Sequence, residues 1–172
     1  MKGWGDEGTG KSTTVWALAA MLVVIVLLST VHLAVLIGEC PMPRNGPRVL
    51  IADDHTLVVD LCKRLLETEF YVVGTVADGR ALVRAAANVK PDVIVVDIAM
   101  PVLNGLDAGR QVKELVPAIK VIFLTMNPDP QIAAEAFRCG ASGYLLKTCA
   151  SSELILAVRD VLRGKSYMSH SL

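Results

Sequence analysis

Short apolar runs alternate with amphipathic segments from Arg48 almost to the end of the chain. Runs rich in β-branched residues and bounded by turn-forming residues predict strands, at 48–52, 71–76, 93–97, 120–125 and 143–146. Apolar residues at helical spacing predict helices, at 57–68, 80–88, 106–116, 131–139 and 152–163. This alternation indicates an α/β domain with a parallel sheet covered by helices.

Five such units make a (βα)5 domain, for which we predict a flavodoxin-like, doubly wound sheet. Crossovers between parallel strands are right-handed in nearly all proteins, and the usual strand order is 2-1-3-4-5. Ligands of this fold bind where the carboxyl ends of strands 1 and 3 meet. We therefore expect a site at the ends of the runs 48–52 and 93–97.

Carboxylates stand at both of these strand ends. Asp97 closes the apolar run 93–97, and Asp53 and Asp54 directly follow the run 48–52. Three carboxylates within a few ångströms repel one another unless a cation compensates their charge. A hard divalent ion such as Mg²⁺, held by carboxylates, a backbone carbonyl and waters, suits such a cluster.

Two further polar side chains end the last two strands. Thr125 closes the fourth strand with a hydroxyl, and Lys147 follows the fifth with an ammonium. The predicted site thus combines acids that can hold a metal, a carboxylate that can act as a nucleophile, a hydroxyl and a fixed cation. Together these groups suit phosphoryl transfer onto Asp97.

Each of these residues also has a purely structural interpretation when it is taken alone. The alternatives are a turn former at Asp97, a surface charge at Lys147, a β-former at Thr125 and a helix cap at Asp54 or Thr56. Their coincidence at corresponding strand ends favours the functional interpretation.

Residues 48 to about 168 resemble the receiver domain of bacterial two-component response regulators. The resemblance rests on five pieces in order: Asp53-Asp54, Val96 to Pro101 (VDIAMP), Asn104-Gly105-Leu106, Leu124-Thr125, and Gly143 to Lys147 (GYLLK). It implies a phosphorelay signalling module rather than an enzyme, in which Asp97 takes a phosphoryl group from the phosphohistidine of a sensor histidine kinase.

The resemblance also implies the ligands of the cofactor. In the family, the acids that match Asp53, Asp54 and Asp97 hold Mg²⁺ together with a backbone carbonyl, which matches that of Ala99. Asn104-Gly105 is expected to be a turn into the helix 106–116 with no catalytic role.

A conformational switch is implied as well. The residues that match Thr125 and Lys147 bind the phosphoryl oxygens, and Tyr144 matches the aromatic that changes rotamer when the threonine moves. Phosphorylation adds about −1.5 to −2 of charge, which draws both groups inward and reshapes the surface around the fourth and fifth helices. Plain core packing is the alternative role for Tyr144.

Charge and the end of the chain bear on the partners. Lys+Arg and Asp+Glu are equal at 17 each, without a basic stripe. The run 157–169 resembles receivers of the subfamily with a LuxR-type helix-turn-helix, yet the chain stops at Leu172, so we expect no direct nucleic-acid binding. Expected partners are a sensor histidine kinase and a second copy or a downstream protein; a chain that only drains phosphoryl groups from the kinase is the alternative.

The four cysteines, Cys40, Cys62, Cys139 and Cys149, have no C-x-x-C spacing. This scatter favours free thiols over a disulfide framework or a zinc site.

A continuous apolar stretch precedes the domain. Residues 15–37 contain no Asp, Glu, Lys, Arg, Pro or Gly, and His32 is their only ionisable side chain. As a helix they would be about 34 Å long, enough to cross a bilayer core of roughly 30 Å. We predict a transmembrane helix that tethers the domain to the cytoplasmic side of the inner membrane. A cleaved signal peptide and an extension from a wrong start codon are the alternatives.

The polar segment 1–14 matches the P-loop pattern G-x-x-x-x-G-K-[ST] at Gly5 to Ser12. A working P-loop needs a strand before it and an amphipathic helix after it. A P-loop nucleotide hydrolase is therefore only the alternative function, and we assign no nucleotide-binding residue. The Pro- and Gly-rich segment 38–47 is predicted to be a linker, which leaves 48–168 for the receiver domain and 169–172 as a tail.

Overall fold

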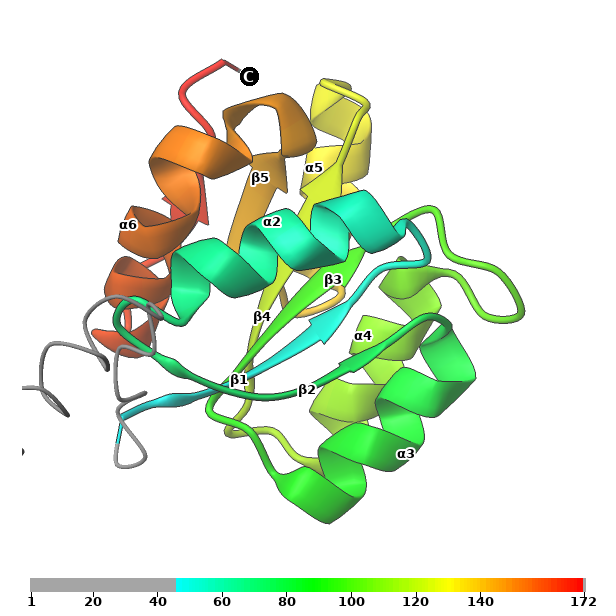
Figure 1. Ribbon diagram of the computed structural model, residues 1–172. Helices are drawn as coiled ribbons and strands as arrows, with labels where there is room; N and C mark the ends of the chain where they lie inside the picture. The colour runs from blue at the N-terminus through cyan, green and yellow to red at the C-terminus, as the bar shows by residue number, and fades with distance from the viewer. Residues whose placement is uncertain (1–45, 172) are drawn as a thin grey trace, which may run out of the picture. The chain divides into compact units, whose positions relative to one another are not determined.

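Parallel strands form one sheet in the computed structural model, which describes residues 46–171 (Figure 1). Within these residues the order is β2-β1-β3-β4-β5-β6, so the predicted flavodoxin-like order 2-1-3-4-5 is confirmed. The first five strands have the predicted bounds. The strands are β1 (Arg48–Ala52), β2 (Tyr71–Val76), β3 (Val93–Asp97), β4 (Lys120–Thr125), β5 (Gly143–Leu146) and β6 (Tyr167–Met168).

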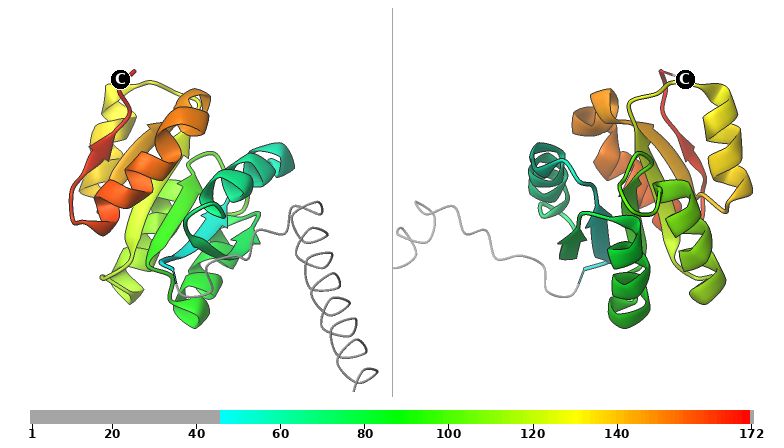
Figure 2. Two further views of the ribbon diagram at one scale, coloured as in Figure 1. Left: turned by 60° about the vertical axis from the view of Figure 1, so that its left-hand side comes forward. Right: turned by 90° about the vertical axis from the view of Figure 1, so that its right-hand side faces the viewer.

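Helices cover both faces of this sheet, with α2 and α6 on one face and α3, α4 and α5 on the other (Figure 2). Their bounds differ from the predicted ones by only one or two residues. The helices are α2 (Thr56–Leu66), α3 (Gly79–Val89), α4 (Gly105–Leu115), α5 (Pro130–Arg138) and α6 (Ala150–Leu162), with a 3-10 turn, η1 (Lys147–Cys149), before α6.

Strand β3 lies between β1 and β4 and is buried along its whole length. Val93 and Val95 pack into the core beneath α2 and α6, whereas Ile94 and Val96 pack into the core beneath α3, α4 and α5. Side chains alternate between the two faces of a strand, so an unbroken apolar run is what a doubly covered strand requires. The apolar run therefore continues to the carboxyl end of β3, where Asp97 is the first polar side chain.

Polar side chains cap three of the helices. The carboxylate of Asp78 accepts a hydrogen bond from the Ala81 amide at 2.7 Å and caps α3. The side chain of Asn104 caps α4, and Asp129 caps α5. The predicted turn at Asn104 is therefore also the start of a helix, in keeping with the preference of Asn and Asp for this position.

The sixth strand was missed by sequence reasoning. The amide of Tyr167 donates to the carbonyl of Ser142 (3.0 Å), and the amide of Ser169 donates to the carbonyl of Tyr144 (2.9 Å). The Glu153 carboxylate on α6 fastens the strand, because it accepts from the Tyr167 hydroxyl (3.1 Å) and from the Ser169 hydroxyl (2.8 Å). The contacts of the domain thus continue through Ser169.

Some expectations concern residues 1–45, which lie outside the described part of the chain. They are the transmembrane helix 15–37, the P-loop-like stretch from Gly5 to Ser12, and Cys40. Between residues 46 and 171, no helix is both long and apolar enough to cross a bilayer. The three cysteines in that range are free thiols, as expected: Cys62, Cys139 and Cys149.

We expect Glu153→Gln to loosen β6. Burial raises the pKa of the Glu153 carboxyl, but hydrogen bonds from Ser169, Tyr167 and His170 outweigh it and leave that pKa below its ordinary value of 4.5. Because the folded pKa is depressed, the carboxylate stabilises β6 fully above pH 4.5 and less as the pH falls through the lowered value. Hydrogen bonds to a charged group contribute about 1.5 kcal/mol or more, so the Tyr167 and Ser169 amides should exchange about tenfold faster in the variant at pH 7.

Hydrogen exchange measured by mass spectrometry on the peptide that contains β6 tests this expectation. Asp160→Asn is the matched control, because Asp160 lies on the same helix and pairs with Arg163 and Lys165. The difference between Glu153→Gln and the unmodified protein should shrink below pH 4.5. Equal exchange in both variants at pH 7 would contradict the role of Glu153.

Candidate phosphoacceptor site

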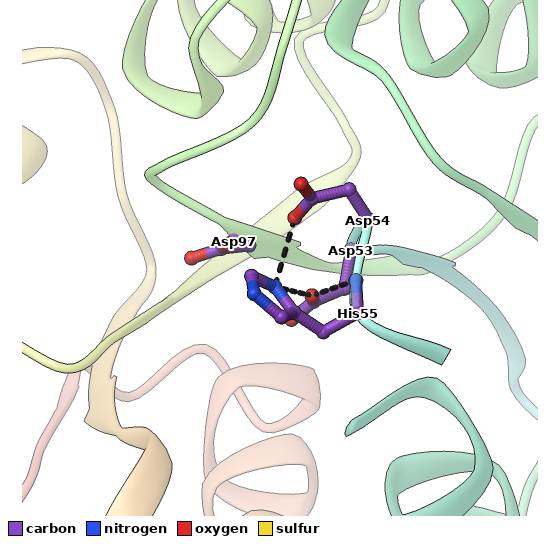
Figure 3. A group of neighbouring side chains, drawn as sticks. All are labelled: Asp53, Asp54, His55 and Asp97. Atoms are coloured by element: carbon purple, nitrogen blue, oxygen red, sulfur yellow. Dashed lines mark hydrogen bonds and ion pairs between the residues drawn. The ribbon is translucent and has the colours of Figure 1, made fainter. Parts of the chain in front are cut away.

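Four polar side chains meet at the carboxyl ends of β1 and β3 (Figure 3). Asp53 follows β1 and Asp97 ends β3, and both carboxylates are buried, whereas Asp54 and His55 lie on the more exposed connection to α2. One potential ligand atom from each of the four lies within 4.8 Å of all the others. The three predicted carboxylates are therefore brought together as expected.

The sheet register sets this geometry. β1 and β3 are hydrogen-bonded parallel neighbours, with Ala52 aligned to Val96, so the next residue of each strand, Asp53 and Asp97, reaches the edge at the same level. The backbone at Asp53 is held from both neighbouring strands. β1 pairs with β3 on one side, and on the other side the Asp53 amide donates to the carbonyl of Val76 in β2 (3.1 Å). Neither carboxylate depends on a mobile loop for its position.

Lys147 joins the cluster from the end of β5. Its ammonium lies 2.8 Å from Oδ2 of Asp53 and 2.9 Å from Oδ2 of Asp97, and its side chain is only 8% exposed. Burial lowers the pKa of this amine, but the two carboxylates more than compensate, so the pKa is raised above its ordinary value of 10.5. Lys147 is therefore a fixed positive charge, as predicted, and not a solvated surface residue.

These acids fit a hard divalent cation. The cluster contains three carboxylates, and the Lys147 ammonium pairs with two of them, so negative charge is left over. The Oδ2 atoms of Asp53 and Asp97 are buried, and although Lys147 is within ion-pair distance, neither has a partner with hydrogen-bond geometry among residues 46–171. Lys147 compensates one of these two buried charges, and a further cation would compensate the charge that remains. Ala99 is adjacent, and its amide donates to Oδ1 of Asp97 (3.2 Å).

Thr125 and Tyr144 are connected through one residue of the loop between β4 and α5. The hydroxyl of Thr125, buried at the end of β4, accepts a hydrogen bond from the Asn127 amide (3.0 Å). The hydroxyl of Tyr144, which is fully buried, donates to the Asn127 carbonyl (3.1 Å). Burial raises the pKa of this phenol. Thr125 follows Leu124, the residue paired with Asp97, so the hydroxyl lies at the same edge of the sheet as the acids.

The loop after Asp97 returns very close to the strand it leaves. A Cβ atom at Gly105 would lie 2.0 Å from the carbonyl oxygen of Asp97, so only glycine fits there. Within the loop, the Leu103 amide donates to the Pro101 carbonyl (2.8 Å), which makes a three-residue γ-turn centred on Val102. Val102 has a φ of 68°, an unfavourable value for a β-branched residue.

Sequence reasoning missed His55. Its Nδ1 lies 2.9 Å from Oδ1 of Asp54 and 3.3 Å from Oδ1 of Asp53 (Figure 3). Its position directly after two acids at a strand end was the available signal, because imidazole is a common metal ligand. The capping alternative for Asp54 or Thr56 is wrong, because His55 occupies the N-cap of α2 and no side chain caps that helix.

Comparison with known proteins identifies the family of this domain. A family model described as the response regulator receiver domain matches residues 49–159. The chain belongs to the response regulator receiver family. The receiver domain therefore supplies the flavodoxin-like sheet and the acidic pocket described above.

Individual relatives resemble this receiver domain closely. The transcriptional regulatory protein DegU of Brevibacillus brevis is 39% identical over 126 residues, which cover 72% of this chain and 53% of that protein. A LuxR-family two-component response regulator from Aurantimonas sp. SI85-9A1 has a TM-score of 0.70 and 31% identity, over 73% of this chain and 91% of that one. The isolated REC domain of RcsB from Salmonella enterica serovar Typhimurium, solved with the phosphomimetic BeF3−, has a TM-score of 0.68 and 30% identity. The match covers 74% of this chain and 96% of that one. The chain spans about half the length of the curated relatives it matches, so the similarity concerns their receiver part.

We expect Gly105→Ala to destabilise the receiver domain and to displace Asp97. The new methyl group would collide with backbone rather than with a flexible side chain. Overpacking of this kind costs about 3 kcal/mol, measured as the loss in the free energy of unfolding by urea. Gly74→Ala is the control, because its Cβ would make an ordinary contact at 3.6 Å with Leu50. Similar losses in the two variants would contradict the proposed close approach.

We expect Val102→Gly to stabilise the domain, in contrast to Val102→Ala. A left-handed conformation costs a residue with a Cβ roughly 1–2 kcal/mol, whereas glycine loses only about 0.5–1 kcal/mol through the entropy of the unfolded chain. Val102 is 72% exposed, so little packing is lost. The free energy of unfolding should therefore rise by about 0.5 kcal/mol with glycine and should not rise with alanine. Equal unfolding midpoints in urea for the two variants would argue against strain at this turn.

Proposed function

We propose that this chain is a phosphoacceptor in a two-component phosphorelay and receives a phosphoryl group from a sensor histidine kinase on Asp97. The observation that carries the proposal is the ion cluster at the sheet edge, in which Lys147 lies between Asp53 and Asp97. A buried carboxylate next to a fixed ammonium and two further acids has the components that phosphoryl transfer to an acid requires.

In the proposed reaction, an oxygen of the ionised Asp97 carboxylate attacks the phosphorus of a phosphohistidine. The P–O bond to Asp97 forms while the P–N bond breaks, and the imidazole leaves with the electron pair of that bond and takes up a proton. Mg²⁺, when bound, neutralises the charge on the phosphoryl oxygens. Asp53, Asp54, Asp97 and the carbonyl of Ala99 are the residues proposed to hold it.

The other residues of the pocket have distinct roles in this proposal. Burial alone would lower the pKa of Lys147, but Asp53 and Asp97 raise it above its ordinary value, so Lys147 stays charged at neutral pH and can pair with a phosphoryl oxygen without a proton transfer. The amide of Ala99 orients the acceptor through its hydrogen bond to Oδ1 of Asp97. Thr125 is proposed to donate its hydroxyl proton to the phosphoryl group, while its oxygen accepts from the Asn127 amide.

The signal is proposed to leave the pocket through Asn127. If Thr125 moves toward the phosphoryl group, the bond between its hydroxyl and the Asn127 amide changes, and Tyr144 is bonded to the carbonyl of the same residue. The affected surface comprises α5, β5 and α6. A coupling free energy of roughly 1–3 kcal/mol between pocket and surface would be ordinary for such a switch.

Partners and location follow as further parts of the proposal. The changed surface is proposed to bind a second copy or a downstream protein rather than nucleic acid, because basic and acidic residues are balanced along the chain. The proposed boundaries are those of the sequence analysis, with a polar segment at 1–14, a membrane tether at 15–37, a linker at 38–47, the receiver domain at 48–168 and a tail at 169–172, whose first residue, Ser169, is bonded to the domain.

We expect Asp97→Asn to abolish phosphorylation. The purified chain is incubated with acetyl phosphate and Mg²⁺, and the mass increase of one phosphoryl group is measured by intact-protein mass spectrometry. Asp92→Asn is the matched control, because Asp92 precedes the other end of the same strand and accepts from the Arg48 amide. The control variant should gain the phosphoryl group to the same extent as the unmodified protein. In both proteins this mass increase should require Mg²⁺. Full labelling of Asp97→Asn would refute the proposed acceptor.

A further inference from the structure

The imidazole of His55 takes part in the acidic pocket but has no role in the proposed phosphoryl transfer. Its Nδ1 faces two of the acids, at 2.9 Å from Oδ1 of Asp54 and 3.3 Å from Oδ1 of Asp53. Its side chain is 65% exposed, so the ring is held mainly by these contacts and has room to turn. In Figure 3 the ring lies beside the carboxylates and not away from them.

We infer that His55 is a nitrogen ligand of the metal pocket and makes it bind first-row transition ions such as Co²⁺ and Mn²⁺ in addition to Mg²⁺. This inference rests on the proposed function, because the ion is the one that would neutralise the phosphoryl group. It adds a fourth side chain, and a different donor atom, to the three carboxylates.

The spacing of the donor atoms fits a single ion. In an octahedral complex with bonds of about 2.1 Å, adjacent ligands lie about 3.0 Å apart and opposite ligands about 4.2 Å apart. The distances from His55 Nδ1 to the two aspartate oxygens are those of adjacent ligands, and the four donor atoms span no more than 4.8 Å. Small rotations of Asp54 and His55, which are the exposed members, would close the remaining difference.

A second observation concerns the charge balance of the same cluster. The Oδ2 atoms of Asp53 and Asp97 are buried without a hydrogen-bond partner of good geometry among the described residues, and Lys147 supplies only one positive charge. The pocket is therefore short of positive charge on its buried side and carries a nitrogen donor on its open side.

The chemistry of the donors sets the choice of ion. Mg²⁺ prefers oxygen ligands and retains its waters, so an imidazole adds little to its binding. Imidazole suits the later divalent ions, whose affinities rise from Mn²⁺ through Co²⁺ toward Cu²⁺. His55 should therefore raise the affinity for Co²⁺ much more than that for Mg²⁺.

Titration calorimetry of the full chain without a purification tag, at one fixed pH, tests this selectivity. MgCl2 and CoCl2 are titrated into the unmodified protein, His55→Gln and His170→Gln. Glutamine keeps a donor that can bond to Asp54. His170 is the matched control, because it contacts Glu153 on α6 and not the pocket acids. We expect His55→Gln to weaken Co²⁺ binding about tenfold or more and Mg²⁺ binding less than about twofold, with no change in His170→Gln.

Pulsed electron paramagnetic resonance gives a readout that does not depend on a variant's stability. Mn²⁺ bound to the unmodified protein should show the ¹⁴N modulation of a coordinated imidazole, and this signal should be lost in His55→Gln. A signal without imidazole nitrogen, or equal effects of the substitution on Co²⁺ and Mg²⁺, overturns the inference. If Mg²⁺ binds and Asp97 is phosphorylated under those outcomes, the proposed function stands; if the unmodified protein binds neither ion, the proposed function fails as well.

Discussion

The main constraint on this domain is the burial of two carboxylates beside one ammonium, which the surrounding elements have to hold in place. Asp53 and Asp97 are almost completely removed from water, and each has an oxygen within 3 Å of Lys147. Burying a charge costs several kcal/mol unless a well-placed partner compensates it, and such pairs add little net stability. The cluster is therefore better explained by chemistry than by stability. Negative charge remains after Lys147 is counted, which favours the binding of a cation.

The sheet maintains this cluster of buried charges by holding the backbone of the strands rigid. β3 is buried on both faces and pairs with strands on both sides, so Asp97 sits at the end of the most constrained segment of the domain. Gly105 completes the constraint, because the absence of a side chain lets the returning loop touch the Asp97 carbonyl. Polar side chains on a rigid backbone are already in position before a reaction, so they do not have to reorient during it. This is called electrostatic preorganisation.

Sequence alone was sufficient where one physical rule dominated. The bounds of the first five strands followed from β-branched runs, because a strand covered on both faces has to be apolar throughout. Asp53, Asp97 and Lys147 followed from their positions at strand ends. The strand β6 could not be predicted, because two residues carry no periodicity and its pairing depends on the distant Glu153. His55 was missed although it directly follows two acids in the sequence, because only the fold shows that its ring turns toward them.

Strand β5 lies on the path of the proposed signal. Lys147 follows it directly and reaches into the pocket, while Tyr144, three residues earlier, bonds to Asn127 in the loop after β4. The backbone carbonyl of Tyr144 also accepts from Ser169, which follows β6. A strand of four residues that is buried throughout cannot deform at one end alone. In the proposed switch, a displacement of Lys147 or Tyr144 would therefore pass to β6, which pairs with β5, and to α6, which packs against the same core.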